Sequence, residues 1–382
     1  MTPTAAAPAV DAAAILALTE SPPGYDPDWW RGALPRFTGG LPGGRGRFAD
    51  AVDAIRQLAA AAVPSPVHNG VVQSGALLAA LGEREHLNAL TAGERRYAFC
   101  VTEPDGSYGP GSIRTRAEPT GKSWRLDGTK CFVPYAADAD VLLVVARVPG
   151  PVSVADGRRA PDVVAAFAVD AAAPGVRIEP IPTIGLDHQC AISLRAAPAR
   201  RLGAFRRPGR PPDPTDPTDP TEPTDPTDSA LSRGTIALAA DALGAAEAAM
   251  RYAVERVSTR VQQGTPLGTR QAVKHRCADM LLDVALVAGV VERAARLLDR
   301  DAAPDDVRRA AAIAKAAAAT RCRRVTASAH QLCGGDGIHA DRPLHLWYRR
   351  VKAAEPMLGD PRHHRATVAT TLLDSSRSEG FG

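Results

Sequence analysis

The strongest constraint in this sequence is one long amphipathic stretch towards its C-terminal end. Apolar residues recur there at steps of three and four: Val273, Cys277, Met280, Leu281, Val284, Ala288, Val291, Ala295 and Leu298. This spacing predicts a helix of about seven turns with one continuous apolar face. Other helices must cover that face, and the sequence offers candidates over 231–258, 303–332 and 343–355. We therefore predict a bundle of long helices over residues 230–382.

A different pattern precedes the bundle. Three short runs rich in β-branched residues, bounded by Gly, Pro or Asp, lie at 139–148, 163–169 and 176–182. Such runs favour strands, so residues 96–207 are expected to form a central, mostly antiparallel β domain. Residues 1–95 are expected to form a shortened helical domain, with helices near 48–62 and 71–91. The predicted fold class is therefore α+β.

Residues 208–229 separate the β domain from the bundle and contain the repeat DPTDPTDPTEPTDPTD at 213–228. Polyproline II has three residues per turn, so the acidic side chains of this repeat fall along one edge. Their repulsion and the fixed proline φ should keep the tract extended. We interpret it as a solvated linker or loop insertion, with a docking strip for a basic partner as the alternative.

Composition narrows the classes of function and location. The formal net charge is only +4, and no basic stripe alternates with aromatic residues, so nucleic acid is not an expected partner. The cysteines form no CxxC pair, which is typical of a reduced, intracellular protein. The sequence has no run of about 18 apolar residues, so no membrane span is predicted. Asp11, close to the first apolar stretch, argues against a signal peptide, so we expect a cytoplasmic protein.

Several common motifs are missing or out of context. The glycines at 334–337 follow a predicted helix rather than a strand, so they are not a Rossmann fingerprint. The sequence has neither a Walker A loop nor a GxSxG elbow. His363, His364 and the other histidines lack metal-ligand spacing with Cys or carboxylates, so no metal site is expected.

Three separated segments carry a family resemblance. They are YAFCVTEP (97–104) followed by DGTKCFVPYAADADVLLVV, then RVQQGTPLGTRQAVKHRCADM (260–280), and then QLCGGDGIHADRPLHLWYRR (331–350). In this order and spacing they resemble the acyl-CoA dehydrogenase family of flavoproteins. The resemblance covers about residues 95–365.

The resemblance implies a helical N-terminal domain, a central β domain and a C-terminal four-helix bundle. It also implies an FAD bound between the sheet and the bundle, with part of the site supplied by a neighbouring subunit. The implied reaction is α,β-dehydrogenation of an acyl thioester on CoA or an acyl-carrier protein. Electrons would pass to an electron-transfer flavoprotein or a similar acceptor, and the chain would form a homo- or hetero-dimer or tetramer.

Residues matching the family's cofactor site are taken from these segments. They are Cys100, Val101, Thr102, Phe132, Val133, Pro134, Arg260, Gln262, Gln331, Gly334 and Gly335. A strand that starts at 100–102 offers N–H and C=O groups to the polar edge of a flavin ring. The resemblance places Arg260 at the diphosphate of an FAD bound to a neighbouring subunit. Its guanidinium can bind a diphosphate through two hydrogen bonds. Glycines at 334–335 let the backbone approach the dinucleotide closely.

The sequence departs from the family where a catalytic carboxylate is expected. Leu358 stands at the position of the family glutamate, and the other position that relatives use is near Gly234. Neither side chain can take a proton. Glu355 and Asp360 flank the first position and are the remaining candidates for the base.

The substrate loop differs as well. Tyr108 stands where relatives have a small hydroxyl, and Ser107 could take that role after a shift of one residue. Together with Leu358, these two residues are the expected substrate contacts. Two further functions stay open: a catalytically incomplete subunit of a hetero-oligomeric acyl-CoA dehydrogenase, and a flavin tailoring enzyme of secondary metabolism.

Overall fold

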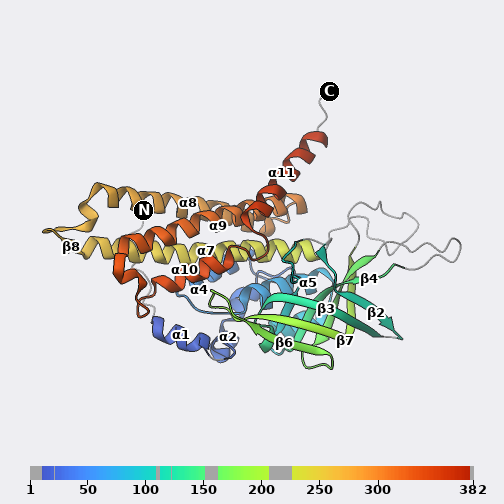
Figure 1. The fold of residues 1–382 in the computed structure, drawn as a ribbon. Coiled ribbons are helices and arrows are strands. Elements are labelled where there is room, and N and C mark those ends of the chain that lie inside the picture. The colour runs from blue at the N-terminus through green and yellow to red at the C-terminus, as the bar shows by residue number, and fades with distance from the viewer. Residues whose placement is uncertain are drawn as a thin grey trace.

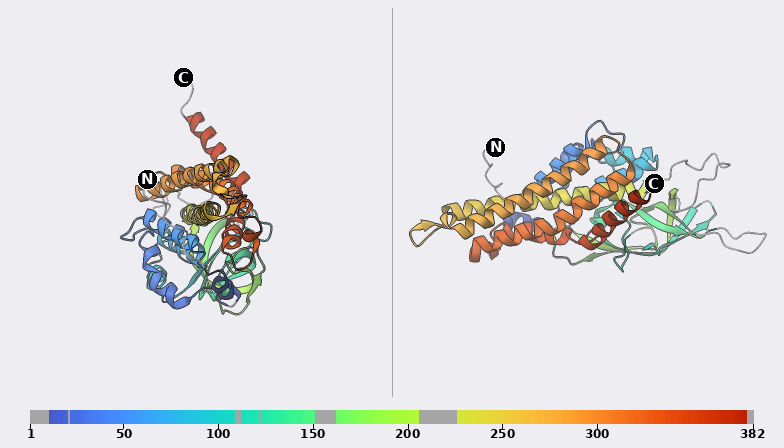
Figure 2. Two further views of the ribbon diagram at one scale, coloured as in Figure 1. Left: turned by 90° about the vertical axis from the view of Figure 1, so that its left-hand side faces the viewer. Right: turned by 90° about the horizontal axis from the view of Figure 1, so that it is seen from above.

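The computed structural model describes residues 11–20, 22–108, 112–121, 123–150, 162–205 and 226–378. A helical N-terminal region, a sheet and a set of long helices follow one another along the chain (Figure 1). Seen from above, the long helices run alongside one another and extend well beyond the sheet (Figure 2). This order agrees with the predicted α+β class.

The N-terminal region is built from short helices. They are α1 (Ala12–Glu20), α2 (Pro27–Ala33), α3 (Pro35–Thr38), α4 (Phe48–Ala60), the π-helix η1 (Val67–Gln73), α5 (Ser74–Ala80) and α6 (Arg84–Thr91). The helix predicted over 48–62 corresponds to α4. The single helix predicted over 71–91 is wrong, because the chain turns between α5 and α6 at Gly82, which has φ +70°. A left-handed residue of this kind ends a helix.

The strands between the N-terminal helices and the first long helix of the C-terminal region form one sheet. They are β1 (Tyr97–Cys100), β2 (Arg116–Thr120), β3 (Ser123–Pro134), β4 (Val141–Val148), β5 (Val163–Asp170), β6 (Val176–Ile181) and β7 (Gln189–Phe205). The order β4–β2–β3–β7–β5 closes on itself because β5 also pairs with β4, while β1 and β6 add to β4 and β7. Only the pairings of β4 with β1 and β2 are parallel among the described strands. The predicted strands match β4, β5 and β6.

The C-terminal region contains the predicted long helices. They are α7 (Pro226–Thr259), α8 (Gln271–Asp299), α9 (Pro304–Cys333), α10 (Leu344–Ala354) and α11 (Pro361–Ser378). A short hairpin of β8 (Val261–Gln262) and β9 (Thr265–Pro266) joins α7 to α8. The end of the acidic repeat is helical, because α7 already begins at Pro226, and this differs from the extended form predicted for 213–228. The rest of that repeat lies outside the described residues.

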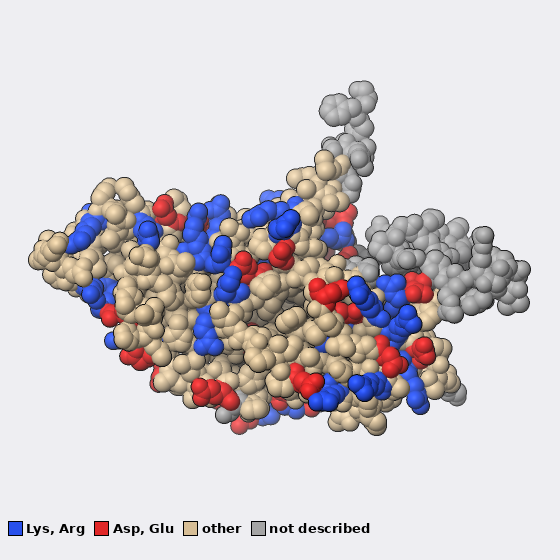
Figure 3. All heavy atoms as spheres, in the orientation of Figure 1, with Lys and Arg blue, Asp and Glu red and all other residues tan. Residues whose placement is uncertain are grey.

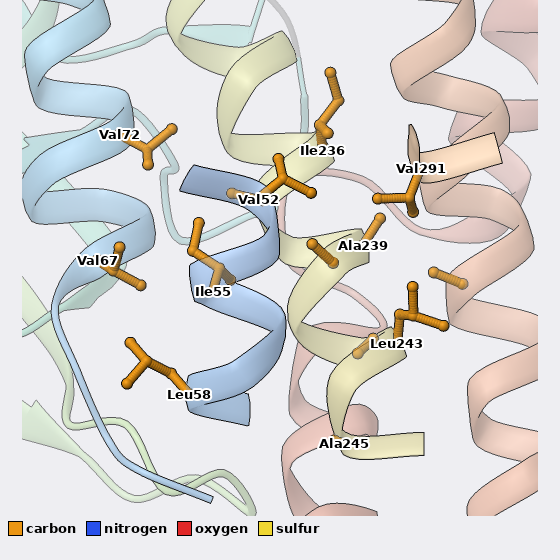
Figure 4. Close-up of a cluster of buried hydrophobic side chains, with 14 of the residues drawn as sticks. Val52, Ile55, Leu58, Val67, Val72, Ile236, Ala239, Leu243, Ala245 and Val291 are labelled. Carbon is orange, nitrogen blue, oxygen red and sulfur yellow. The ribbon is translucent and has the colours of Figure 1, made fainter. Parts of the chain in front are cut away.

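The apolar face predicted for α8 is largely buried. Met280, Val284, Val291 and Ala295 lie in the core, whereas Leu281 is 50% exposed. Figure 4 shows side chains of α4, η1, α7 and α8 meeting in one cluster. The helical regions at the two ends of the chain therefore share a single core.

The surface carries charges of both signs. Lys and Arg side chains alternate with Asp and Glu over the visible face, and no large area of that face carries one sign only (Figure 3). Among the described residues, every helix is too short or too polar to span a lipid bilayer.

Close contact between α4 and α7 depends on a glycine. A Cβ atom at Gly244 would lie 2.1 Å from the backbone oxygen of Arg56, so the two helices could not keep this distance. Gly289, in the middle of α8, has no heavy atom within 4 Å of the same position. The two glycines occupy helix interiors but only one of them is needed for packing.

We expect Gly244→Ala to lower the free energy of unfolding by about 1–3 kcal/mol, because the new methyl group overpacks a backbone contact. Gly289→Ala should raise it by about 0.5–1 kcal/mol, because alanine is the better helix former and the site is open. Urea unfolding of both variants beside the wild type measures the difference. Equal effects of the two substitutions would contradict this account of the α4–α7 contact.

Candidate active site

The main cavity, of about 910 Å³, is lined by residues of the β domain, η1, α7 and the turn after α10. This volume is typical of sites for small molecules and cofactors. Predicted site residues that line it are Val101, Thr102, Tyr108, Phe132, Val133, Pro134, Glu355, Leu358 and Asp360. Cys100 is fully buried behind this wall and is not among the lining residues. The structure thus brings residues of the first segment and residues that follow the third segment to one cavity.

The β-domain wall combines two strand ends. The backbone N–H of Cys131 donates to the carbonyl of Thr102 at 2.9 Å, which holds the ends of β1 and β3 together. The pairing of β3 with β7 is irregular between Lys130 and Val133, and Phe132 there has φ +54°. A bulky residue in this region is a true outlier. The irregularity leaves the Phe132 ring 48% exposed at the cavity wall.

A buried ion pair supports that wall from behind. Lys130 Nζ lies 2.8 Å from Glu103 Oε1 and 3.2 Å from the carbonyl of Val101, and both side chains are buried. Burial raises the pKa of Glu103, but Lys130 and the hydrogen bonds from Thr115 outweigh it, so the net shift is downwards. Glu103 is therefore ionised and fixes the strand end that carries Val101 and Thr102.

A second buried pair lies deeper in the cavity. Arg350 on α10 contacts Asp241 on α7 through Nε and Nη2 at 2.8–3.0 Å. Burial works against ionisation of Asp241, yet the charge of Arg350 keeps the pKa of this carboxyl well below its usual range. His68 Nε2 lies 3.4 Å from the same carboxylate. All three residues line the cavity.

The turn after α10 carries Leu358 into the cavity in a left-handed conformation, with φ +54°. Lys315 on α9 fixes this turn, because its Nζ donates to the carbonyls of Glu355 at 2.9 Å and Gly359 at 3.2 Å. Tyr108 donates from Oη to the carbonyl of Pro356 at 2.6 Å. The turn is therefore held from two sides.

Both candidates for the base have structural partners. Glu355 Oε2 lies 3.0 Å from Lys352 Nζ and 3.8 Å from Arg323 Nε. Asp360 Oδ1 accepts the backbone N–H of His363 at 2.7 Å, at the start of α11, and this bond lowers its pKa. Their carboxylates stabilise neighbouring structure in this chain.

A smaller cavity of about 240 Å³ adjoins the same turn. It shares Val101, Thr102, Tyr108 and Leu358 with the main cavity, and the first residues of α7 also line it. Ser107 lines this cavity only. His363 stacks at a tilt against Tyr108, with ring centroids 5.1 Å apart, and His364 is buried beside it. The three expected substrate contacts therefore meet here.

The second predicted cofactor group lies elsewhere. Figure 1 places β8 at the end of the bundle remote from the sheet. Arg260, at the start of this hairpin, and the helical turn η5 (Gly334–Ile338) come together there, because Asp336 pairs with both Arg256 and Arg260. Members of this group are exposed or half-buried: Arg260, Gln262, Gln331, Gly334 and Gly335. None of them lines the main cavity.

Sequence reasoning missed several polar residues of the main cavity. Gln73 Nε2 and Gln189 Oε1 are buried, line the cavity and have no hydrogen-bond partner among the described residues. Asp241 and His68 were missed too. The only signal in the sequence is that polar residues interrupt apolar helical runs, and this does not reveal which residues they meet.

Comparison with known proteins identifies the family. The acyl-CoA dehydrogenase middle-domain model matches residues 98–196, and the acyl-CoA dehydrogenase C-terminal-domain model matches residues 227–373. The chain belongs to the acyl-CoA dehydrogenase family. Membership confirms the expected fold and the expectation of a flavoprotein oxidoreductase that uses FAD.

Relatives and solved structures agree with this assignment. The short-chain specific acyl-CoA dehydrogenase of Bos taurus is 29% identical over 75% of this chain, which spans 65% of that relative's length. The acryloyl-CoA reductase (NADH) of Anaerotignum propionicum is 28% identical over 75% of this chain and 69% of its own length. The Tcur3481-Tcur3483 steroid ACAD structure has a TM-score of 0.78 at 26% identity, covering 96% of this chain and 94% of its own. Butyryl-CoA dehydrogenase from Megasphaera elsdenii, at 22% identity and a TM-score of 0.77 over 95% of this chain and 98% of its own, shares the fold.

The residues of the main cavity fit a flavin ring. The ring has a polar edge with donors and acceptors and two flat apolar faces. Gln189 Oε1 is a buried acceptor without a hydrogen-bond partner among the described residues, and Gln189 lies on β7 opposite Pro134 of the same cavity wall. Phe132 and Val133 offer apolar surface next to it. This acyl-CoA dehydrogenase family member therefore has a wall suited to FAD.

Lys315 generates a testable pH dependence. Burial lowers its pKa to about 7, against an ordinary value of 10.5, with Glu355 and Asp360 opposing the shift. Between these pH values the unfolded chain binds more protons than the folded chain, so stability rises with pH, by up to about 1.4 kcal/mol per unit. The stability of the wild type relative to Lys315→Met should therefore increase from pH 7 to pH 10.

Urea unfolding at several pH values measures this difference. The matched control is Lys274→Met, which removes an exposed lysine of α8. Parallel stability curves for wild type and Lys315→Met across the range would show that the Lys315 ammonium is not destabilised by burial.

Proposed function

We propose that this protein is an FAD-dependent dehydrogenase that oxidises an acyl thioester between its α and β carbons. The observation that carries the proposal is the meeting of residues 101–102 and 132–134 with the turn at Leu358 in one cavity. FAD, when bound, supplies the acceptor for a hydride equivalent. The chain's own residues hold the ring, exclude water and orient the thioester.

Each part of the cavity has a role in the proposal. The backbone at 101–102, held by Lys130 and Glu103, presents hydrogen-bonding groups to the ring edge, and Phe132 packs on the ring. The smaller cavity at Tyr108 and Ser107 would receive the CoA end of the thioester, and the acyl group would enter the main cavity past Tyr108 and Leu358, which line both. The other wall of the smaller cavity is formed by the start of α7.

The base that would remove the α proton is missing from both positions that the family uses. Leu358 offers no acceptor, and Glu355 and Asp360 are occupied by Lys352 and by the N-terminus of α11. At Gly234 a side chain would meet Gln73, because its Cβ would lie 2.6 Å from Gln73 Cγ. Neither family position therefore carries a carboxylate in this chain.

This observation favours a second candidate: a subunit without its own base, which works with a partner chain of the same family. The solved steroid ACAD is named for two components, Tcur3481 and Tcur3483. A hetero-oligomer would also place Arg260 and η5 of this chain beside the partner's cofactor. The electron acceptor would be an electron-transfer flavoprotein or a similar protein in either case.

Anaerobic titration of the FAD-loaded protein with a panel of acyl-CoA thioesters tests the proposal through the flavin absorbance. Bleaching by at least one thioester is expected for the complete enzyme. Bleaching only after co-expression with a relative that has a glutamate at the position of Leu358 would identify the incomplete subunit. An FAD-loaded protein that no thioester reduces, alone or with such a relative, contradicts both candidates.

Installing a base should raise activity. Leu358→Glu places a carboxylate on a side chain that already lines both cavities. Because a positioned general base contributes about 10²–10⁴ to a rate, we expect flavin reduction to accelerate by about 100-fold or more. Anaerobic stopped-flow absorbance measures it, with Leu372→Glu at an exposed position of α11 as the control. Equal rates for the two variants would show that position 358 is not next to the reacting carbon.

Arg260 tests the shared cofactor site. Arg260→Met should weaken FAD binding to the assembled oligomer by about 10- to 100-fold, because hydrogen bonds to charged groups contribute about 1.5–3 kcal/mol. The FAD content after dialysis measures this, and Arg276→Met, at an exposed position of α8, is the control. Unchanged FAD affinity would assign Arg260 to its ion pair with Asp336 alone.

A further inference from the structure

The π-helix η1 determines which side chains reach the cavity from the N-terminal region. A π-helix closes its hydrogen bonds over five residues, and the N–H of Ser74 donates to the carbonyl of Asn69 in this way. Residues five apart therefore share a face. Val67 and Val72 both belong to the core cluster drawn in Figure 4, and His68 and Gln73 both line the main cavity.

This segment is fixed against the flavin wall. Asn69 Nδ2 donates to the carbonyl of Phe99 at 2.8 Å, and Asn69 Oδ1 accepts the N–H of Phe99 at 2.7 Å. Both bonds are buried. The position of η1 relative to β1 is thus defined by two directional contacts.

Gln73 ends the π-helix with an unused donor. Its side chain is 3% exposed, it lines the cavity, and Nε2 has no hydrogen-bond partner among the described residues. It packs over Gly234, whose absent Cβ leaves the space that the amide fills. An unpaired buried amide costs free energy that a hydrogen bond from it would recover. The group points to a ligand with an acceptor atom.

The surrounding charges indicate what kind of acceptor fits. Arg350 is engaged by Asp241 and by the carbonyl of Val63, and Lys352 is engaged by Glu355. These are the two buried or half-buried Lys and Arg residues among those that line the cavity. The charge of an anionic group would not be neutralised here, because both cations are already paired with carboxylates. A neutral oxygen can accept a hydrogen bond from the Gln73 amide without burying an unpaired negative charge.

We propose that Gln73 Nε2 donates to an uncharged oxygen on the acyl group, and that the substrate is a keto- or hydroxyacyl thioester rather than a plain alkyl one. This inference rests on the proposed function. The oxygen lies at the γ carbon or beyond, because dehydrogenation removes hydrogen from the α and β carbons. Recognition by a buried amide also rejects analogues without the oxygen, since the donor is then left unpaired.

Calorimetric titration of the FAD-loaded protein with matched thioesters tests this without requiring turnover. The pairs are pentanoyl-CoA with 4-oxopentanoyl-CoA, hexanoyl-CoA with 5-oxohexanoyl-CoA, and heptanoyl-CoA with 6-oxoheptanoyl-CoA. For at least one pair we expect the oxo compound to bind about tenfold more tightly. Gln73→Leu and Gln73→Met should each remove this ratio, and Gln57→Leu, at an exposed position of α4, should retain it.

The outcomes separate the inference from the proposed function. Equal binding within every pair, with flavin bleaching by the alkyl compounds, overturns the inference and leaves the dehydrogenase intact. Oxo preference that depends on Gln73, without bleaching by any thioester, supports the inference and contradicts autonomous dehydrogenation. Loss of FAD from the Gln73 variants with the ratio retained assigns the amide to the cofactor and overturns the inference. No binding of any thioester overturns both.

Discussion

The arrangement of the cavity depends on one buried charge pair, Arg350 with Asp241. The guanidinium comes from α10, the carboxylate from α7, and a third contact reaches the carbonyl of Val63 after α4. Next to it, the indole N–H of Trp347 donates to the carbonyl of Ala60. Breaking one partner of such a pair costs about 3–5 kcal/mol, because the other charge stays buried. The N-terminal helices and the bundle are therefore joined at the floor of the cavity.

The same logic of buried polar support recurs at each wall. Lys130 and Glu103 hold the strand end at Val101, and Asn69 holds η1 against Phe99. Lys315 holds the turn of Leu358 through backbone carbonyls alone. In each case a side chain behind the wall fixes backbone at the wall, which leaves the front free for a ligand. Rigid elements placed in this way are what a preorganised site requires.

The parts of the fold that the sequence predicted are those governed by local periodicity. The apolar steps from Val273 to Leu298 and the β-branched runs predict α8, β4, β5 and β6 because burial follows the helical or strand period. The π-helix escaped prediction because VHNGVVQ has neither period, and Gly and Val are poor helix formers. Asp241 and Arg350 are 109 residues apart, so their pairing is a property of the tertiary structure. That Arg260 lies away from the main cavity is likewise a property of the tertiary structure.

Several residues around the main cavity are strained or lack hydrogen-bond partners, and this bears on whether the cavity binds a ligand. Phe132 and Leu358 are bulky residues with φ near +54°, and such conformations cost about 1–3 kcal/mol each. Gln73 and Gln189 add buried polar atoms that have no hydrogen-bond partner in the described part of the chain. A chain without a ligand to bind would gain stability by relaxing the strained and unpaired groups. Their presence together around the cavity supports the proposal that this cavity binds cofactor and substrate.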